Sequence, residues 1–203
     1  MNGGAITDAL FVYLEGMPEP ESIQALCDSY TNRPLVCLSG AWETYIHTHH
    51  PTAACYQRYL MTPRKEFKLS TDCSLPVGFE VRGFDENIFA QHPFSHGENY
   101  PSFKDFQKSG SGAAVLHDNR IVASASSFLS YQGEVELDVS TDTAFRRMGL
   151  ATACIRQMLY DCQRRGITVH WDAQNEASRH LAEKIGFQIQ RTYPVYILST
   201  ERE

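Results

Sequence analysis

The stretch that decides the fold of this 203-residue chain is Arg146-Arg147-Met148-Gly149-Leu150-Ala151, residues 146–151. Residues 134–139 before it alternate acidic and apolar side chains, which predicts a strand with one solvated face. The helix after it has one apolar stripe and ends at a glycine, with the positions Leu150, Cys154, Ile155, Met158, Leu159, Cys162 and Gly166. A strand, a glycine-containing loop and a helix N-terminus together predict an anion site, because unpaired backbone N–H groups and the helix dipole attract negative charge.

Two residue types strengthen this anion site. Gly149 has no Cβ, so the backbone can approach a phosphate closely, and Arg146 and Arg147 add positive charge beside it. These features alone are not specific, because any strand-to-helix turn can contain glycine and arginine. A second pattern follows, with a strand predicted at 169–173, then Asn175, then a helix whose apolar face and end are Ala177, Leu181, Ile185 and Gly186-Phe187.

Taken together, the two patterns resemble the GCN5-related N-acetyltransferase (GNAT) superfamily. The cofactor loop of that family reads Arg/Gln-x-x-Gly-x-Gly/Ala, which Arg146, Gly149 and Ala151 match. Its next strand leads to an asparagine and a helix ending in Gly-Phe, which Asn175 and Gly186-Phe187 match. One branch of the family, the zwittermicin A resistance-type acetyltransferases, is more similar still. Its signature resembles Trp171-Asp172-Ala173-Gln174-Asn175, Ser178 and residues 181–184. Residues 12–16, 75–79 and 105–113 are also similar to that branch, but more loosely.

The resemblance implies a mixed α/β (α+β) GNAT fold, in which helices flank a central, mostly antiparallel twisted sheet. The residues before it alternate strand-like and helix-like stretches, which predicts a small α/β N-terminal subdomain. A turn-rich stretch at 70–76 marks the boundary between the subdomain, 1–74, and the GNAT acetyltransferase domain, 75–203. In the subdomain, the patterns predict strands at 11–14 and 34–38 and helices at 19–30 and 42–50.

Further elements are predicted between the subdomain and the cofactor loop, with a helix at 85–92 and strands at 77–81, 112–116, 120–124 and 126–130. The sequence His117-Asp118-Asn119 is a good hairpin turn between two of these strands. After the last helix, Ile189 and residues 195–198 are predicted to form two closing strands.

The resemblance also implies an activity, that of an acetyl-CoA-dependent N-acetyltransferase. Such an enzyme transfers an acetyl group to a primary amine of a small molecule by direct attack of the amine on the thioester. The implied cofactor is acetyl-CoA, held by loop amides and arginines, by one strand edge and by two polar side chains: Arg146, Arg147, Met148, Gly149, Leu150, Ala151, Leu137, Val139, Asn175 and Ser178. Asn175 is equally suited to be the N-cap of the next helix, and both roles can hold together.

The general base is less clearly marked by the sequence. Glu134, Glu136 and Asp138 share one face of the strand that approaches the thioester. His170 lies on the next strand, five residues before Asn175, where some relatives place a catalytic glutamate. A histidine suits proton transfer at neutral pH. Glu136 and His170 are therefore the candidate bases, and a chain of water molecules is the remaining option.

The general acid departs from the family's pattern. Many relatives carry a tyrosine seven residues after the asparagine, but this chain has Ala182 there. An alanine cannot donate a proton. Tyr193 or Tyr196 is the expected replacement, with protonation of the thiolate by solvent as the alternative.

Composition bounds the partners and the location. The net charge is −6 and the pI about 5.7, with no block of basic residues, which argues against a nucleic-acid partner. Residues 1–5 lack the features of a signal peptide, and no apolar run approaches the roughly 20 residues of a membrane span. We therefore expect a cytoplasmic protein. It is a monomer or a homodimer, and the sequence does not indicate which. His47-x-His49-His50 has no suitably spaced partner, so no metal site is predicted.

Two other classes of function remain open at this point. Ala182 and the lack of an unambiguous base favour a non-catalytic acyl-CoA-binding or regulatory module. Acetylation of a protein or of an aminoacyl-tRNA is the other alternative, although the acidic pI argues mildly against RNA.

Overall fold

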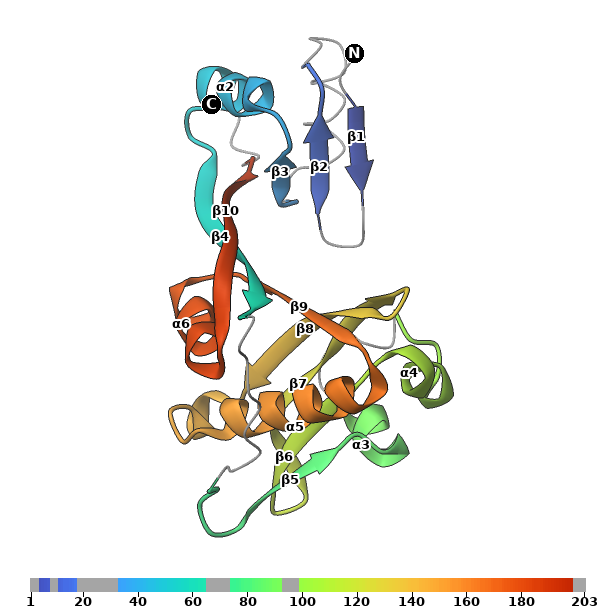
Figure 1. Ribbon diagram of the computed structural model, residues 1–203. Helices are drawn as coiled ribbons and strands as arrows, with labels where there is room; N and C mark the ends of the chain where they lie inside the picture. Colours follow the sequence, from blue (N-terminus) through green and yellow to red (C-terminus); the bar gives the residue numbers. More distant parts are fainter. Residues whose placement is uncertain (1–3, 8–10, 18–32, 65–73, 93–98, 199–203) are drawn as a thin grey trace. The chain divides into compact units, whose positions relative to one another are not determined.

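The computed structural model describes residues 4–7, 11–17, 33–64, 74–92 and 99–198. The chain divides into two compact units, Met1–Tyr59 with Arg191–Glu203, and Leu60–Gln190 (Figure 1). This division differs from the predicted boundary between residues 74 and 75, because a late strand returns to the first unit. The predicted helix at 19–30 and most of the turn-rich stretch at 70–76 lie outside the described residues.

The second unit is built on a mostly antiparallel sheet. Its strand order is β10-β4-β9-β8-β7-β6-β5, of which β4 and β10 belong in part to the first unit. The strands are β4 (Ala54–Pro63), β5 (Phe79–Gly83), β6 (Gly112–His117), β7 (Arg120–Tyr131), β8 (Glu134–Thr141), β9 (Thr168–Ala173) and β10 (Phe187–Ile197). Strands β5 to β8 pair antiparallel in sequence order, and β9 pairs parallel with β8. The predicted mixed α/β class with a mostly antiparallel sheet is thus confirmed.

Tight turns explain why β6, β7 and β8 are antiparallel neighbours. Asp118 and Asn119, between β6 and β7, have φ angles of 49° and 59°, which short polar side chains tolerate. Gln132 and Gly133 repeat the arrangement between β7 and β8, with φ angles of 49° and 84°. The predicted hairpin around residues 117–119 is therefore confirmed.

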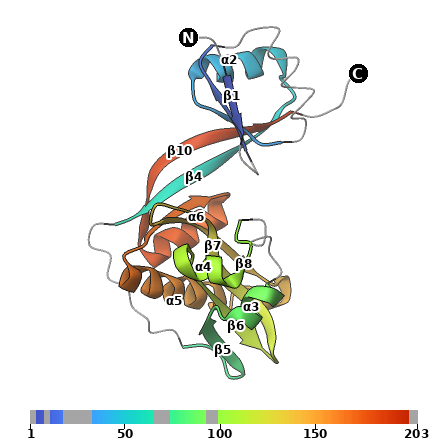
Figure 2. The ribbon, with the colours of Figure 1, turned by 90° about the vertical axis from the view of Figure 1, so that its right-hand side faces the viewer.

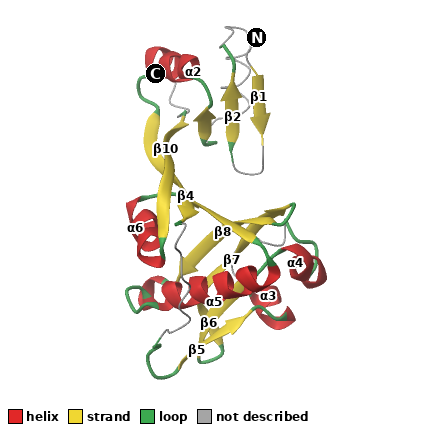
Figure 3. Ribbon diagram, in the orientation of Figure 1, coloured by secondary structure: helices red, strands yellow, loops and turns green. Residues whose placement is uncertain are grey.

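Helix α5 (Leu150–Arg165) packs across strands β5 to β8 (Figure 1). Figure 3 shows the same helix in red against the yellow strands of the sheet. Its buried side chains are Leu150, Ala153, Cys154, Ile155, Met158, Leu159 and Cys162. Gly166 ends the helix in the left-handed region, with φ 67°, and its N–H donates to the carbonyls of Cys162 and Gln163. Both the apolar stripe and the glycine stop match the sequence prediction.

Two short helices, α3 (Glu86–Gln91) and α4 (Phe103–Ser109), carry an aromatic cluster. The cluster consists of Phe84, Phe89, His92, Tyr100, Phe103 and Phe106, with ring centroids 4.9–6.4 Å apart. Gly112 lets this cluster approach the sheet, since a Cβ there would lie 3.0 Å from the Phe84 ring. Helix α3 was predicted, whereas α4 was not.

The first unit combines strands from both ends of the chain with one helix. Its strands β1 (Gly4–Thr7) and β2 (Val12–Glu15) are antiparallel, and β2 is parallel to β3 (Leu35–Cys37). Residues Val195 and Tyr196 of β10 pair antiparallel with β3. The core under helix α2 (Gly40–His49) contains Val12, Leu14, Leu35, Cys37, Trp42, Ile46, Tyr196 and Leu198. The predicted strands at 11–14 and 34–38 and the helix at 42–50 are confirmed to within two residues at each end.

The prediction of two closing strands is wrong, because β10 is one continuous strand, Phe187–Ile197. Its middle, residues 188–192, is exposed and mostly polar, so the apolar pattern is interrupted there. Strands β1 and β4 were not predicted. In the described part of the chain, no helix is both long enough and apolar enough to cross a membrane.

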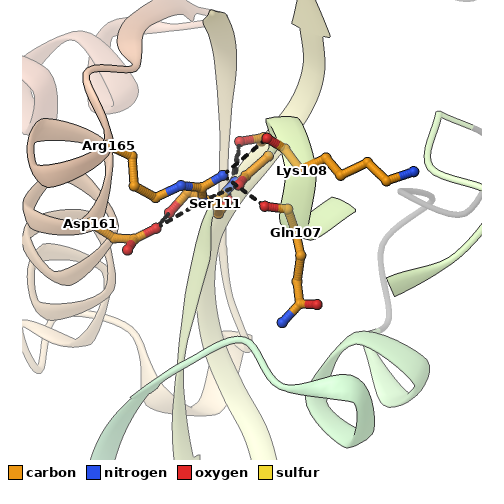
Figure 4. Close-up of polar contacts among 7 residues, drawn as sticks. Gln107, Lys108, Ser111, Asp161 and Arg165 are labelled. Carbon is orange, nitrogen blue, oxygen red and sulfur yellow. Dashed lines mark hydrogen bonds and ion pairs between the residues drawn. The ribbon is translucent and has the colours of Figure 1, made fainter. Parts of the chain in front are cut away.

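An arginine joins the end of α5 to the end of α4 (Figure 4). One Arg165 terminal nitrogen donates to Gly110 O at 2.6 Å, and the other donates to Gln107 O at 2.8 Å. Asp161 accepts from Arg165 at 3.1 Å and from the Ser111 hydroxyl at 2.8 Å. The guanidinium thus provides donors to carbonyls at the C-terminus of α4, where positive charge is favourable.

We expect Arg165→Ala to lower the free energy of unfolding by about 2 kcal/mol, because the part-buried Gly110 carbonyl and Asp161 lose a charged donor. Chemical denaturation of the variant measures this loss. Arg164→Ala is the matched control, since the described residues give Arg164 a contact with the Tyr160 ring, with 5.8 Å between guanidinium carbon and ring centroid, and no hydrogen bond to α4. Equal losses in both variants would contradict the proposed anchoring role of Arg165.

Candidate functional site

The loop between β8 and α5 leaves the start of the helix uncapped. A 3₁₀ turn, Thr143–Phe145, follows β8, and Asp142 accepts from Ala144 N at 3.0 Å. Gly149 is the N-cap of α5, with φ 82° and no side-chain hydrogen bond to the first turn. The first helical bond joins Ala153 N to Gly149 O at 3.1 Å. The backbone N–H groups of residues 149–152 therefore precede that bond and can donate to an anion.

Space around the loop is compatible with a bound phosphate. A Cβ built on Gly149 would meet no atom within 4 Å, so the backbone is approachable at that point. Arg146 and Arg147 are exposed beside it, and the Arg146 Nε donates to Thr141 O at 3.4 Å. Met148 is 38% exposed. The predicted loop residues are thus gathered at one helix end, with charge and geometry that fit a pyrophosphate.

Strands β8 and β9 part before β8 ends. Their parallel ladder has three residue pairs and ends at Glu136–His170. Strand β8 continues to Thr141, and Leu137 and Val139 pair with β7 on the other side. In Figure 1 the two strands diverge beyond this point. In the described residues, Leu137 and Val139 have no pair on β9, and the pairing of this edge with an extended ligand that carries amide groups stays a prediction.

Hydrogen bonds tie two acidic side chains of β8 to β9. The Glu134 Oε2 lies 3.0 Å from the His170 Nε2, and both side chains are exposed. The Glu136 Oε1 accepts from the backbone N–H of Asp172 at 2.7 Å. Glu136 thus satisfies a backbone donor at the place where the ladder ends. Its predicted role as a base stays a prediction, as does that of His170.

The third acidic side chain, Asp138, is partly buried. Burial raises the pKa of this carboxyl above its ordinary value, while a hydrogen bond to the Val139 backbone lowers it by less. A raised pKa brings a carboxylate closer to the basicity that proton abstraction at neutral pH requires.

Asn175 and Ser178 have structural partners in the described residues. The Asn175 Oδ1 accepts from Ser178 N at 3.0 Å and caps α6 (Glu176–Ile185). The Trp171 Nε1 donates to the Ser178 hydroxyl at 3.2 Å. The predicted N-cap role of Asn175 is confirmed, and cofactor binding by the two residues stays a prediction.

The tyrosines considered as proton donors both lie on the part of β10 that belongs to the first unit. The Tyr196 hydroxyl lies 3.0 Å from the His47 Nε2 in the core of that unit, and burial is the largest cause that raises its pKa to about 12. Tyr193 is partly buried, and its role as an acid stays a prediction. Ala182 is fully buried on α6, so the position of the usual tyrosine is occupied by core packing.

The sequence did not single out two positions that belong to the site. Thr152 contributes the last N–H of the uncapped first turn, which counting from an N-cap at Gly149 would have revealed. Ser126, buried on β7, pairs directly with Asp138 across the strands, and no local pattern marks that pairing. Among the residues described, no three ligand-type side chains are grouped to hold a metal ion.

Comparison with known proteins bears on this geometry. A family model described as GNAT acetyltransferase matches residues 2–196. The chain belongs to this family. GNAT acetyltransferases typically bind acetyl-CoA, which agrees with the uncapped helix start and the available edge of β8.

Individual relatives agree with the family assignment. An uncharacterized N-acetyltransferase of Bacillus subtilis (strain 168), YdfB, is 30% identical over 138 residues, 65% of this chain and 52% of the relative. The chain thus spans about half the length of that relative. A GCN5-related N-acetyltransferase-like protein from Streptococcus suis 89/1591 is 27% identical, with a TM-score of 0.76 over 96% of this chain and 82% of that one. A GCN5-related N-acetyltransferase from Sphaerobacter thermophilus, 15% identical, shares the fold, with a TM-score of 0.63 over 96% and 75%.

Substitutions of Asn175 can separate its capping from any role toward a ligand of this GNAT chain. We expect Asn175→Ala to lower the free energy of unfolding by about 1 kcal/mol through loss of the cap. Asn175→Asp keeps an acceptor for Ser178 N and should retain stability, while it removes the amide donor. Thermal unfolding measures both, and an equal loss in the two variants would show that the cap is not the source.

Proposed function

We propose that this chain is an acetyl-CoA-dependent N-acetyltransferase that acts on a primary amine of a small molecule. The observation that carries the proposal is the uncapped, glycine-started N-terminus of α5 beside the stretch of β8 that lacks β9 as a partner. The residues from Trp171 to Asn175, together with Ser178, resemble the zwittermicin A resistance-type branch, and we propose that the chain belongs to that branch of the family. A cytoplasmic location and a monomeric or homodimeric state remain predictions.

Backbone groups do most of the proposed cofactor binding. The N–H groups of Met148, Gly149, Leu150 and Ala151 hold the pyrophosphate, and Arg146 and Arg147 add charge. Leu137 and Val139 pair with the amide-rich pantetheine arm along β8, and Asn175 and Ser178 can bind the same arm. Acetyl-CoA, when bound, supplies an acetyl group activated as a thioester.

The acidic face of β8 is proposed to receive the amine. A primary amine is an ammonium ion at neutral pH, and Glu134, Glu136 and Asp138 project carboxylates from alternate positions of one strand. One group of this face, or His170, removes a proton so that the nitrogen can react. The leaving thiolate takes a proton from Tyr193 or from solvent.

Ala182 favours a second candidate function, a non-catalytic module that binds acyl-CoA and regulates another process. The core position of Ala182 leaves no hydroxyl where many relatives have one. Such a module would bind acetyl-CoA without turnover of any amine. Acetylation of a protein or an aminoacyl-tRNA is a further alternative, and the net charge of −6 weighs against RNA.

The cofactor site can be tested by thermal unfolding with and without acetyl-CoA. At about 100 times its Kd the ligand should stabilise the wild type by roughly 2.7 kcal/mol, a Tm rise of roughly 5–10 °C. We expect Gly149→Glu to abolish this rise, because its carboxylate occupies the anion site.

Gly166→Glu is the matched control for that experiment. Gly166 lies at the other end of α5, also has a positive φ, and also faces open space. Both variants therefore carry similar backbone strain, and only Gly149→Glu should lose the ligand-induced rise. No rise in the wild type, or an equal loss in both variants, would refute this cofactor site.

A further inference from the structure

Asp138 lies in a row of side chains that faces the aromatic cluster. Gly112 of β6 pairs with Ser126 of β7, and Ser126 pairs with Asp138 of β8. Directly opposed residues of antiparallel strands project to the same face of the sheet. A Cβ on Gly112 would lie 3.0 Å from both the Ser126 Cβ and the Phe84 ring, so this face carries Phe84. Ser126 is 1% exposed. The row therefore places Asp138 beside a buried layer.

Asp138 differs from the two acidic residues that precede it on β8. Glu134 is hydrogen-bonded to His170, and Glu136 accepts the backbone N–H of Asp172. For Asp138, the recorded hydrogen-bond partner among described residues is only the adjacent Val139 backbone. Among the described residues, its carboxyl is thus not tied to β9 as those of Glu134 and Glu136 are, and burial raises its pKa above the ordinary value.

Its place along β8 also differs. The ladder to β9 ends at Glu136, so Asp138 is the first acidic residue beyond the point where the strands part. The neighbouring residues Leu137 and Val139 offer the backbone edge to which the cofactor arm is proposed to pair. A carboxyl between them projects next to a ligand bound along that edge.

We propose that Asp138 is the catalytic base of this site, an assignment that rests on the proposed acetyltransferase function. The carboxylate accepts one proton from the ammonium of the acceptor. The neutral amine then uses its lone pair to form a C–N bond to the acetyl carbonyl carbon, while the C–S bond breaks and its electron pair leaves with sulfur. The acylated nitrogen then loses its second proton to solvent, and the thiolate takes up one proton from Tyr193 or solvent, so the products are an amide and a thiol.

Other titratable groups surround this position and must be tested alongside it. Glu136 lies on the same strand, and His170 and Asp172 lie on β9. His92 and Tyr100 belong to the aromatic cluster beyond β7. Ser126, the cross-strand partner on β7, does not titrate in this range. A pH effect assigned to Asp138 therefore requires variants of Glu136 and His170 as well.

The kinetic test uses acetyl-CoA with 2-phenylethylamine, spermidine and glucosamine as probe amines, and follows thiol release from pH 5 to 9. We expect Asp138→Asn to lower kcat/KM by about 100-fold or more, with an unchanged Tm rise on binding acetyl-CoA. The acid limb of the wild-type profile should disappear in this variant. Asp118→Asn, in the exposed β6–β7 turn, is the matched control and should retain activity.

Three outcomes would overturn the assignment. The acid limb could persist in Asp138→Asn, or it could disappear in Glu136→Gln or His170→Gln instead. The wild type could also bind acetyl-CoA without turnover of any probe amine, which would support the non-catalytic alternative. A wild type without any Tm rise on acetyl-CoA would refute the proposed function itself, which separates the two failures.

A second measurement needs no acceptor. Because burial raises the pKa of Asp138 in the folded state, its charged form costs stability above that pKa, and the cost disappears as the pH falls toward the unfolded value. Asp138→Asn should therefore have a higher Tm than the wild type at pH 8, with the difference vanishing at acidic pH. A Tm difference that does not change with pH would show that folding does not raise the pKa of the Asp138 carboxyl.

Discussion

The parallel ladder between β8 and β9 ends at Glu136 and His170, and the candidate site is arranged around that end. A backbone N–H that loses its strand partner must find another acceptor, because a buried, unpaired donor is costly. The Glu136 carboxylate provides that acceptor for Asp172. The opening between the strands is thus stabilised by a side chain of the same sheet, and the next residues of β8 keep their edge available.

Helix α5 has very different ends. At its C-terminus, Gly166 satisfies two carbonyls, and Arg165 and Asp161 form polar contacts with Gly110 and Ser111 (Figure 4). Figure 2 shows the ribbons of α4 and α5 from a second side. At its N-terminus the N-cap residue, Gly149, makes no side-chain hydrogen bond to the first turn. The apolar stripe and the C-terminal contacts therefore hold the helix in place. Because they do so, the N–H groups at its N-terminus are not needed for anchoring and can donate to a ligand.

The features predicted correctly from the sequence are those encoded within a few residues. The stripe and stop of α5, the hairpin at residues 117–119 and the cap at Asn175 all follow from helical spacing, positive φ or a short polar side chain. The missed features depend on distant partners. Strand β10 is continuous although its middle is exposed, and α4 has only seven residues. The alternation on β8 predicted a shared acidic face, but the burial of Asp138 comes from packing that sequence spacing does not reveal.

The pairing of β10 with β3 has a consequence for synthesis of the protein. Val195 and Tyr196 pair with β3 in a unit whose strands β1, β2 and β3 lie within the first 37 residues. During synthesis, β3 of the first unit cannot pair with β10 until Val195 and Tyr196 have been made. Residues 60–190 of the second unit have already been made by then. Strand β3 thus lacks its β10 partner until residues 60–190 have been made, and an unpaired strand edge is prone to misassociation during that interval.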